Sequence, residues 1–209
     1  GNAVIVKPAS DTPLSAIKLV EILLEVGFPS EAVSVHTGSG ASVGDAIASD
    51  PRVRKISFTG SRDVGEHICR TAGLKKVTME LGSNSPVVVM DDADIDKVAD
   101  GVALAGFANA GQVCISAQRI LVENKAYGDL TDALQARVEG ITTGNPLADG
   151  TKMGPMIRES DAERVESWIQ EAVAGGARLV AGGSRSGTLH QPTVLADVTP
   201  GMRVSRDEV

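Results

Sequence analysis

The chain has 209 residues, of which 42% are hydrophobic and only 2% aromatic, and its formal net charge is −7. This length provides for one large domain or parts of two, with a core built from Ala, Val, Ile and Leu. The negative, interspersed charge argues against nucleic acid or an anionic membrane as a partner. With two cysteines, no long apolar run and no signal peptide, we expect a cytoplasmic protein without disulfides.

Short β-branched runs alternate with helical patterns in the first part of the chain. Strands are expected at 3–7, 32–36, 53–58 and 75–81, and helices at 13–26, at 41–48 and from 62 to about 71. Thr12 is the expected N-cap of the first helix, with Pro13 in its first turn. This βα alternation predicts a parallel sheet with right-handed crossovers.

A second layer begins after the boundary between Gly82 and Ser83. Strands are expected at 86–90, 120–123, 178–180 and 192–195, and helices at 94–109, 125–138 and 160–174. The predicted fold is therefore α/β, with a parallel-sheet layer at 1–82 joined to a second α/β layer at 83–209. Both ends of the chain are without a cap or lead-in, so we expect both layers to be incomplete and the chain to be an interior piece.

Cys114 follows a small-residue turn that contains Gly111. A thiolate is the reactive form of cysteine, and a nearby base or positive potential is needed to populate it at neutral pH. Gly111 and Ala110 allow the backbone to approach a substrate, and the Cys114 amide is placed to donate to an oxyanion. These features fit a catalytic nucleophile, although a buried structural cysteine is the alternative. Cys69, in a helical pattern, is interpreted as structural.

Glu80 ends an apolar strand, between Met79 and Leu81. A strand end of this kind delivers a side chain to the carboxyl edge of a sheet, where α/β proteins bind ligands. A carboxylate in apolar surroundings is suited to act as a base on a thiol or on water. The alternative is a glutamate exposed at the rim of the sheet.

Two glycine-containing turns connect strands to helices. The run from Gly38 to Gly44 resembles a dinucleotide fingerprint but has one residue too many before its last glycine. Gly60 and Ser61 precede a helix whose N-terminal amides either face a phosphate or serve only as a cap. Lys7 ends the first strand at another carboxyl edge. The histidines have no metal-ligand spacing, so we expect no metal site.

Together these segments resemble the aldehyde dehydrogenase superfamily. The matching motifs follow the family's order over essentially the whole chain, and they are Gly1-Asn2 to Lys7-Pro8, Thr12-Pro13, Phe58-Thr59-Gly60-Ser61, Glu80-Leu81-Gly82, Ser85-Pro86, Gly111-Gln112-Val113-Cys114, Gly144-Asn145-Pro146, Gly154-Pro155, Gly182-Gly183 and Gln191-Pro192-Thr193. Each motif is weak by itself, whereas the ordered set is highly specific.

The resemblance implies an oxidoreductase that converts a small-molecule aldehyde to a carboxylic acid with NAD or NADP. Residues 1–82 would be the latter half of a partly Rossmann-like, dinucleotide-binding domain, and 83–209 would be most of the catalytic domain that carries the cysteine. Cys114 would attack the aldehyde to form a thiohemiacetal, and hydride transfer to nicotinamide would leave a thioacyl-cysteine. Glu80 would activate the water that hydrolyses this thioester. The cofactor-binding residues that the resemblance implies are Lys7, Ser10, Gly60, Ser61, Val64, Gly65, Leu81 and Glu208.

The family pattern also assigns individual roles. Lys7 would contact the adenosine ribose, Gly60 and Ser61 would lie near the pyrophosphate, and Glu208 would hold the nicotinamide ribose. Where NAD-selective members often carry an acid that binds the ribose 2′-hydroxyl, this chain has Ser10, which leaves NADP open.

The resemblance also marks what this chain lacks. The family's upstream asparagine of the oxyanion hole, the segment after Glu208 and the oligomerisation strand are all missing, and Ser83 replaces a second glycine after Glu80. We therefore expect little turnover from the isolated piece, and a homodimeric or homotetrameric parent enzyme.

Two alternative functions stay open. A coenzyme A-acylating dehydrogenase would transfer the acyl group to a thiol instead of water, and it would not need a hydrolytic base such as Glu80. A non-catalytic homologue would keep the fold and would be expected to lose Cys114 or Glu80.

Overall fold

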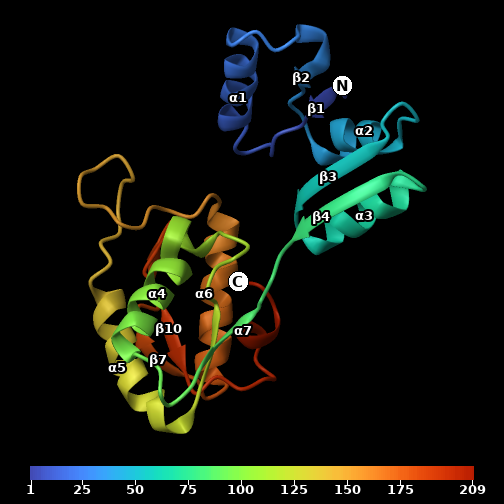
Figure 1. The fold of residues 1–209 in the computed structure, drawn as a ribbon. Coiled ribbons are helices and arrows are strands. Elements are labelled where there is room, and N and C mark those ends of the chain that lie inside the picture. Colours follow the sequence, from blue (N-terminus) through green and yellow to red (C-terminus); the bar gives the residue numbers. More distant parts are fainter. The chain divides into compact units, whose positions relative to one another are not determined.

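The structure, a computed structural model, describes all residues from Gly1 to Val209 (Figure 1). The chain divides into two compact units, Gly1–Gly82 and Ser83–Val209. This division falls at the boundary that the sequence indicates, while the assignment of the units to cofactor binding and catalysis stays a prediction. None of the helices has both the length and the apolar character needed to cross a membrane.

The unit Gly1–Gly82 consists of two parallel strand pairs with helices between the strands. Its elements in chain order are β1 (Val4–Val6), α1 (Leu14–Glu25), a 3-10 turn (Ser30–Ala32), β2 (Val33–Val35), a wide helical turn (Gly40–Gly44), α2 (Asp45–Ser49), β3 (Lys55–Gly60), α3 (Arg62–Ala72) and β4 (Lys76–Leu81). β1 pairs with β2 and β3 with β4, both in parallel, as the alternation predicts. The four strands form two separate pairs instead of one sheet, because the alternation indicates strand direction but not which strands become neighbours.

Two local predictions in this unit are wrong. The cap position of α1 is Pro13, with no side-chain cap hydrogen bond, so Thr12 is not the N-cap. Proline has no amide to satisfy and a φ near the helical value, so the chain enters the helix through Pro13. The helix expected at 41–48 is divided into the wide turn and α2, and Ser39 Oγ accepts the Ser42 amide at 3.2 Å at its start.

The unit Ser83–Val209 packs three long helices around short strands (Figure 1). Its elements are β5 (Pro86–Val89), α4 (Ile95–Phe107), a 3-10 turn (Ala108–Gly111), β6 (Arg119–Val122), α5 (Asn124–Glu139), α6 (Glu159–Ala174), β7 (Arg178–Ala181), β8 (Arg185–Ser186), β9 (Leu189–His190), β10 (Val194–Ala196) and α7 (Arg203–Arg206). β5 and β6 are parallel, whereas β7 with β10 and β8 with β9 are antiparallel. The sequence does not predict β8, β9 or α7, since segments of two to four residues are too short to show a period.

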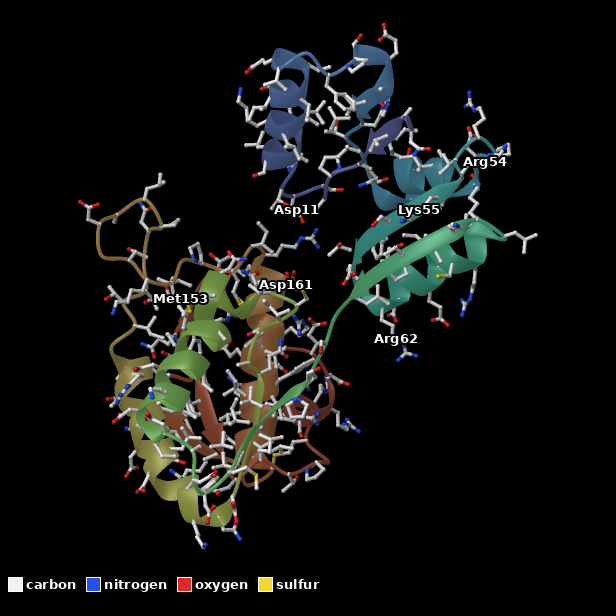
Figure 2. The ribbon with its side chains drawn as sticks, in the orientation of Figure 1. Asp11, Arg54, Lys55, Arg62, Met153 and Asp161 are labelled. Carbon is white, nitrogen blue, oxygen red and sulfur yellow. The ribbon has the colours of Figure 1, made fainter.

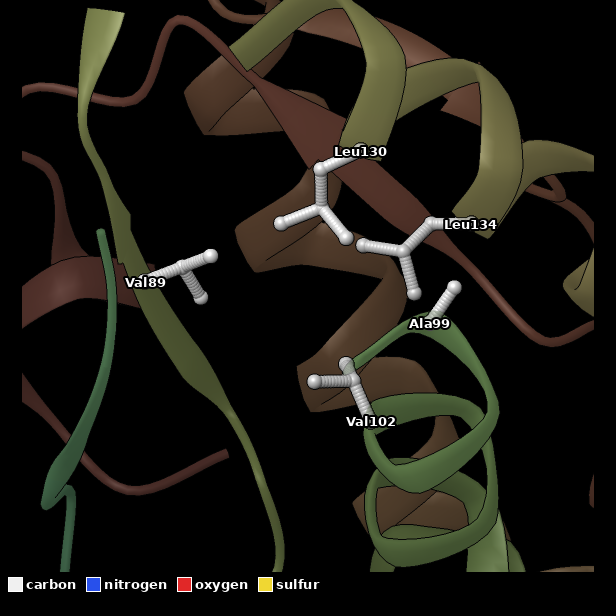
Figure 3. Close-up of a cluster of buried hydrophobic side chains, with 5 residues drawn as sticks. All are labelled: Val89, Ala99, Val102, Leu130 and Leu134. Atoms are coloured by element: carbon white, nitrogen blue, oxygen red, sulfur yellow. The ribbon is translucent and has the colours of Figure 1, made fainter. Parts of the chain in front are cut away.

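The core of this unit lies where β5, α4 and α5 meet (Figure 3). Val89 of β5, Ala99 and Val102 of α4, and Leu130 and Leu134 of α5 form one buried cluster. Ala99 is 0% exposed and Leu130 is 1% exposed. Burying a leucine side chain contributes roughly 1.5–3 kcal/mol, so this cluster stabilises the helix from which the Cys114 segment continues.

A polar cluster links α5 to the β7–β10 pair. Tyr127 Oη donates to Asp197 Oδ1 at 2.7 Å and accepts from the Asp197 amide at 2.9 Å. Arg178 Nε donates to Asp197 Oδ2 at 3.1 Å. The Tyr127 hydroxyl, and then the Arg178 guanidinium, hold the pKa of Asp197 below its ordinary value.

Candidate active site

Cys114 lies in a turn between α4 and β6. Just before it, three successive residues adopt left-handed backbone conformations, with φ of 51° at Asn109, 57° at Ala110 and 76° at Gly111. Only glycine adopts this conformation without cost, and each other residue there stores about 1 kcal/mol or more. Contacts outside the turn must therefore hold Asn109 and Ala110 in place.

Gln112 supplies such contacts. Its Nε2 donates to the Asn109 carbonyl at 3.1 Å, and its Oε1 accepts the Ile157 amide at 3.0 Å. In return, Asn109 Nδ2 donates to the Gln112 carbonyl at 3.4 Å. The sequence predicts no such role for Gln112, because Ile157 lies 45 residues further along the chain.

The other side of Cys114 is fixed to the end of α4. The Ser116 amide donates to the Val113 carbonyl at 2.9 Å, which closes a turn around Cys114. The buried Ser116 also donates through Oγ to the Gly106 carbonyl at 3.2 Å. A Cβ at Gly111 would be 3.3 Å from that same carbonyl oxygen. The glycine is therefore needed both for its backbone conformation and for this close approach.

The Cys114 side chain is exposed, which contradicts the alternative of a buried structural cysteine. Its backbone amide makes no hydrogen bond within the chain. An accessible thiol next to an unpaired N–H is compatible with attack on a carbonyl and stabilisation of the resulting oxyanion. Cys69, on α3, is exposed as well. What distinguishes Cys114 is therefore its left-handed, tethered turn and not its exposure.

Glu80 lies at the carboxyl end of β4. The parallel register pairs Glu80 with Thr59 and Leu81 with Gly60, which brings the predicted residues Glu80, Leu81 and Gly60 to one sheet edge. Glu80 is exposed, so the expectation of apolar surroundings is wrong. Successive residues of a strand face opposite sides, so its half-buried neighbours Met79 and Leu81 turn away from it. This leaves the carboxylate accessible to water.

The start of α3 presents unpaired backbone amides. Ser61 precedes Arg62, the first helical residue (labelled in Figure 2), and makes no side-chain cap hydrogen bond. Both residues are exposed. First-turn amides without partners are suited to an anion such as a phosphate. Val64, one turn on, is 45% exposed. Gly65 is buried, and a Cβ there would be 2.7 Å from Leu81 Cδ2, so glycine allows α3 to lie close to the end of β4.

Lys7 and Ser10 lie together after β1. The half-buried Lys7 donates through Nζ to the Pro8 carbonyl at 2.9 Å. Ser10 Oγ donates to the Gly38 carbonyl at 3.3 Å, which joins the segment after β1 to the one after β2. Because β1 and β2 are parallel, both segments leave from the same edge. Glu208 belongs to the other unit, is exposed, and follows α7.

The fold is that of a two-unit α/β protein with an exposed cysteine and an exposed glutamate at the ends of structural elements. Comparison with known proteins identifies its family. The model of the aldehyde dehydrogenase family matches residues 1–209. The chain therefore belongs to the aldehyde dehydrogenase family. The 3-sulfolactaldehyde dehydrogenase of Priestia aryabhattai is 46% identical over 209 residues, which are 100% of this chain and 44% of that relative. The NADP(+) succinate-semialdehyde dehydrogenase of Escherichia coli is 41% identical over 213 residues, with the same two coverages.

Solved structures agree with this assignment. The crystal structure of the NAD-dependent aldehyde dehydrogenase from Sinorhizobium meliloti has a TM-score of 0.95 and 39% identity, covering 99% of this chain and 42% of that one. The crystal structure of an NADP-dependent enzyme of Escherichia coli has a TM-score of 0.95 and 40% identity, covering 99% and 44%. These matches confirm the predicted fold class, and the chain spans about 44% of the length of the curated relatives described above.

Proposed function

We propose that the protein containing this chain is an NAD- or NADP-dependent aldehyde dehydrogenase that uses Cys114 as its nucleophile. The observation that carries the proposal is the exposed Cys114 thiol, whose unpaired amide lies on a turn held by Gln112 and Ser116. Family membership supplies the reaction class. The unit 1–82 would be part of the cofactor-binding layer, and 83–209 part of the catalytic layer.

In the first half-reaction, the Cys114 thiolate forms a C–S bond to the aldehyde carbon. The developing oxyanion accepts a hydrogen bond from the Cys114 amide. When bound, the nicotinamide cofactor supplies the hydride acceptor for that carbon. The carbonyl then forms again as a thioester on Cys114.

In the second half-reaction, Glu80 takes a proton from water, and the water oxygen attacks the thioester carbon. The C–S bond breaks, and the thiolate and a carboxylic acid are released. Overall, aldehyde, water and NAD(P)⁺ give acid, NAD(P)H and a proton. The accessible position of Glu80 at the sheet edge is compatible with this exchange with water.

The chain's residues fit a dinucleotide, since α3 begins with amides that have no side-chain cap. The pyrophosphate would lie at Gly60 and Ser61, with Val64 and Gly65 on the adenine side of the helix. The position of Ser10, which carries no negative charge, admits a ribose 2′-phosphate, so NADP is a proposed cofactor alongside NAD. Relatives with each cofactor support both readings.

The test uses the full-length protein and aldehyde-dependent NAD(P)H absorbance. We expect Cys114→Ala to abolish turnover while NAD(P)H binding, followed by fluorescence, is retained. Glu80→Gln should still give a rapid burst of about one NAD(P)H per active site, followed by slow turnover, because only hydrolysis is impaired. Cys69→Ala, the other exposed thiol, is the matched control and should leave both measurements unchanged.

Different outcomes would separate the alternatives. Wild-type turnover in Cys114→Ala would overturn the nucleophile assignment. Product that appears only with coenzyme A, as an acyl thioester, would instead show an acylating dehydrogenase. Cofactor binding without turnover of any aldehyde by the wild-type protein would indicate a non-catalytic homologue.

A further inference from the structure

Asn84 connects the start of the second unit to its far end. Its Nδ2 donates to the Ser205 carbonyl at 3.1 Å and to the Asp207 carbonyl at 3.0 Å. Its Oδ1 is buried without a partner. A flipped amide would place that oxygen against two carbonyl oxygens, so the orientation is determined by the contacts. The side-chain NH2 group of Asn84 is therefore bonded twice to the segment that contains Glu208.

Gln118 and Arg119, at the start of β6, hold the same segment. Arg119 Nη1 donates to the Ser205 carbonyl at 3.2 Å. Gln118 Oε1 accepts the Val209 amide at 2.9 Å. Asp207 and Val209, the two neighbours of Glu208, are thus each bonded through their backbone to a side-chain amide. Glu208 itself stays exposed between these two contacts.

We infer that Asn84 and Gln118 form a clamp that positions the Glu208 carboxylate for the nicotinamide ribose. The inference rests on the proposed NAD(P)-dependent function and on the role that the family resemblance gives Glu208, and it adds two positioning residues to that role. A side chain that must bind a ribose hydroxyl is useful only if its backbone is held within a fraction of an ångström. The clamp supplies that restraint, since the residues on both sides of Glu208 are bonded.

The clamp also connects Glu208 to the Cys114 segment. Gln118 lies four residues after Cys114, on the approach to β6. The hydrogen bond from the Val209 amide to Gln118 Oε1 therefore joins the segment that carries Glu208 to the segment that follows Cys114. Glu208, which would hold the ribose, and Cys114, the proposed nucleophile, thus belong to segments that are hydrogen-bonded to each other.

The experiment is a double-mutant cycle in the full-length protein. We measure the KM for NAD(P)⁺ in wild type, Asn84→Ala, Glu208→Gln and the double variant. Loss of one neutral hydrogen bond corresponds to about a fivefold change, so Asn84→Ala, which removes two, should raise the cofactor KM by about five- to thirtyfold. Because Asn84 acts through Glu208, the same substitution should change KM less than twofold in the Glu208→Gln background.

Further variants separate positioning from general destabilisation. Asn84→Asp places an oxygen against both carbonyls and should raise the cofactor KM at least as much as Asn84→Ala. Gln118→Ala should raise the cofactor KM about fivefold, since it removes one hydrogen bond. Gln135→Ala, which removes an amide bonded to Glu139 on the same helix α5, should have no effect. The rate of Cys114 alkylation by iodoacetamide in the cofactor-free Asn84 variants should stay within about twofold of wild type.

Each outcome decides one assignment. If Glu208→Gln leaves the cofactor KM unchanged, the role of Glu208 fails and the clamp inference fails with it. If Glu208→Gln raises KM while Asn84→Ala does not, the clamp alone is overturned. Equal effects of Asn84→Ala in both backgrounds would show a structural role unrelated to Glu208, and would likewise overturn the inference.

Discussion

Replacing Gln112 with alanine tests whether tertiary contacts hold the Cys114 turn. The substitution removes the hydrogen bonds to the Ile157 amide and the Asn109 carbonyl. At about 1 kcal/mol each, their loss weakens the turn by about 2 kcal/mol. The two non-glycine left-handed residues, Asn109 and Ala110, store strain of about 1 kcal/mol or more each. The lost support is therefore comparable to the strain, and the turn should relax.

We expect kcat of the full-length Gln112→Ala enzyme to fall about thirtyfold, the equivalent of 2 kcal/mol, at saturating aldehyde and cofactor. The KM for the cofactor should change little, because Gln112 lies on the Cys114 segment and not at α3. Gln112→Glu keeps an acceptor for the Ile157 amide but turns an oxygen toward the Asn109 carbonyl. Its kcat should lie below wild type, and Gln135→Ala is the matched control.

A wild-type kcat together with a wild-type rate of Cys114 alkylation in Gln112→Ala would contradict this role of Gln112. A fall in kcat that is accompanied by a large fall in the melting temperature would also contradict the role of Gln112, since that pattern indicates general destabilisation of the protein. The positive result is a loss of kcat with a melting temperature within a few degrees of wild type.

Three other substitutions, one of them with a matched control, test the fold of the second unit. Leu130→Ala should lower the free energy of unfolding by about 2–5 kcal/mol in urea titrations, whereas Leu147→Ala, at a residue 93% exposed, should change it by less than about 0.5 kcal/mol. Gly182→Ala should prevent accumulation of folded protein, seen by circular dichroism, because a Cβ at φ 73° would overlap the backbone of Pro192. The lowered pKa of Asp197 stabilises the folded state above the ordinary carboxyl range, and this stabilisation is lost as pH falls. The stability difference between wild type and Asp197→Asn should therefore be constant above about pH 5 and shrink below about pH 4; a difference that does not depend on pH would contradict the assignment.

Periodicity and turn residues are sufficient to predict the principal helices and strands, because each depends on residues close in the chain. The pairing of β1 with β2 and of β3 with β4 also follows in direction from the alternation. Strand neighbours and the two short antiparallel pairs do not follow, since they depend on contacts between distant segments. The exposed setting of Glu80 is a related case, because its apolar neighbours in sequence lie on the other face of the strand.

The Cys114 motif shows why a local pattern carries only part of a functional site. Gly111 is identifiable from the sequence as a residue that permits a left-handed turn, and asparagine, as at Asn109, tolerates this conformation better than most residues, but Ala110 carries no such signal and adopts it as well. Their strain persists because Gln112 reaches Ile157, a contact across 45 residues. The position of the thiol therefore depends on the Ile157 segment as well as on the residues next to Cys114. Conversely, a homologue that kept the motif but lost the Ile157 segment should have a relaxed turn and a cysteine no more reactive than Cys69.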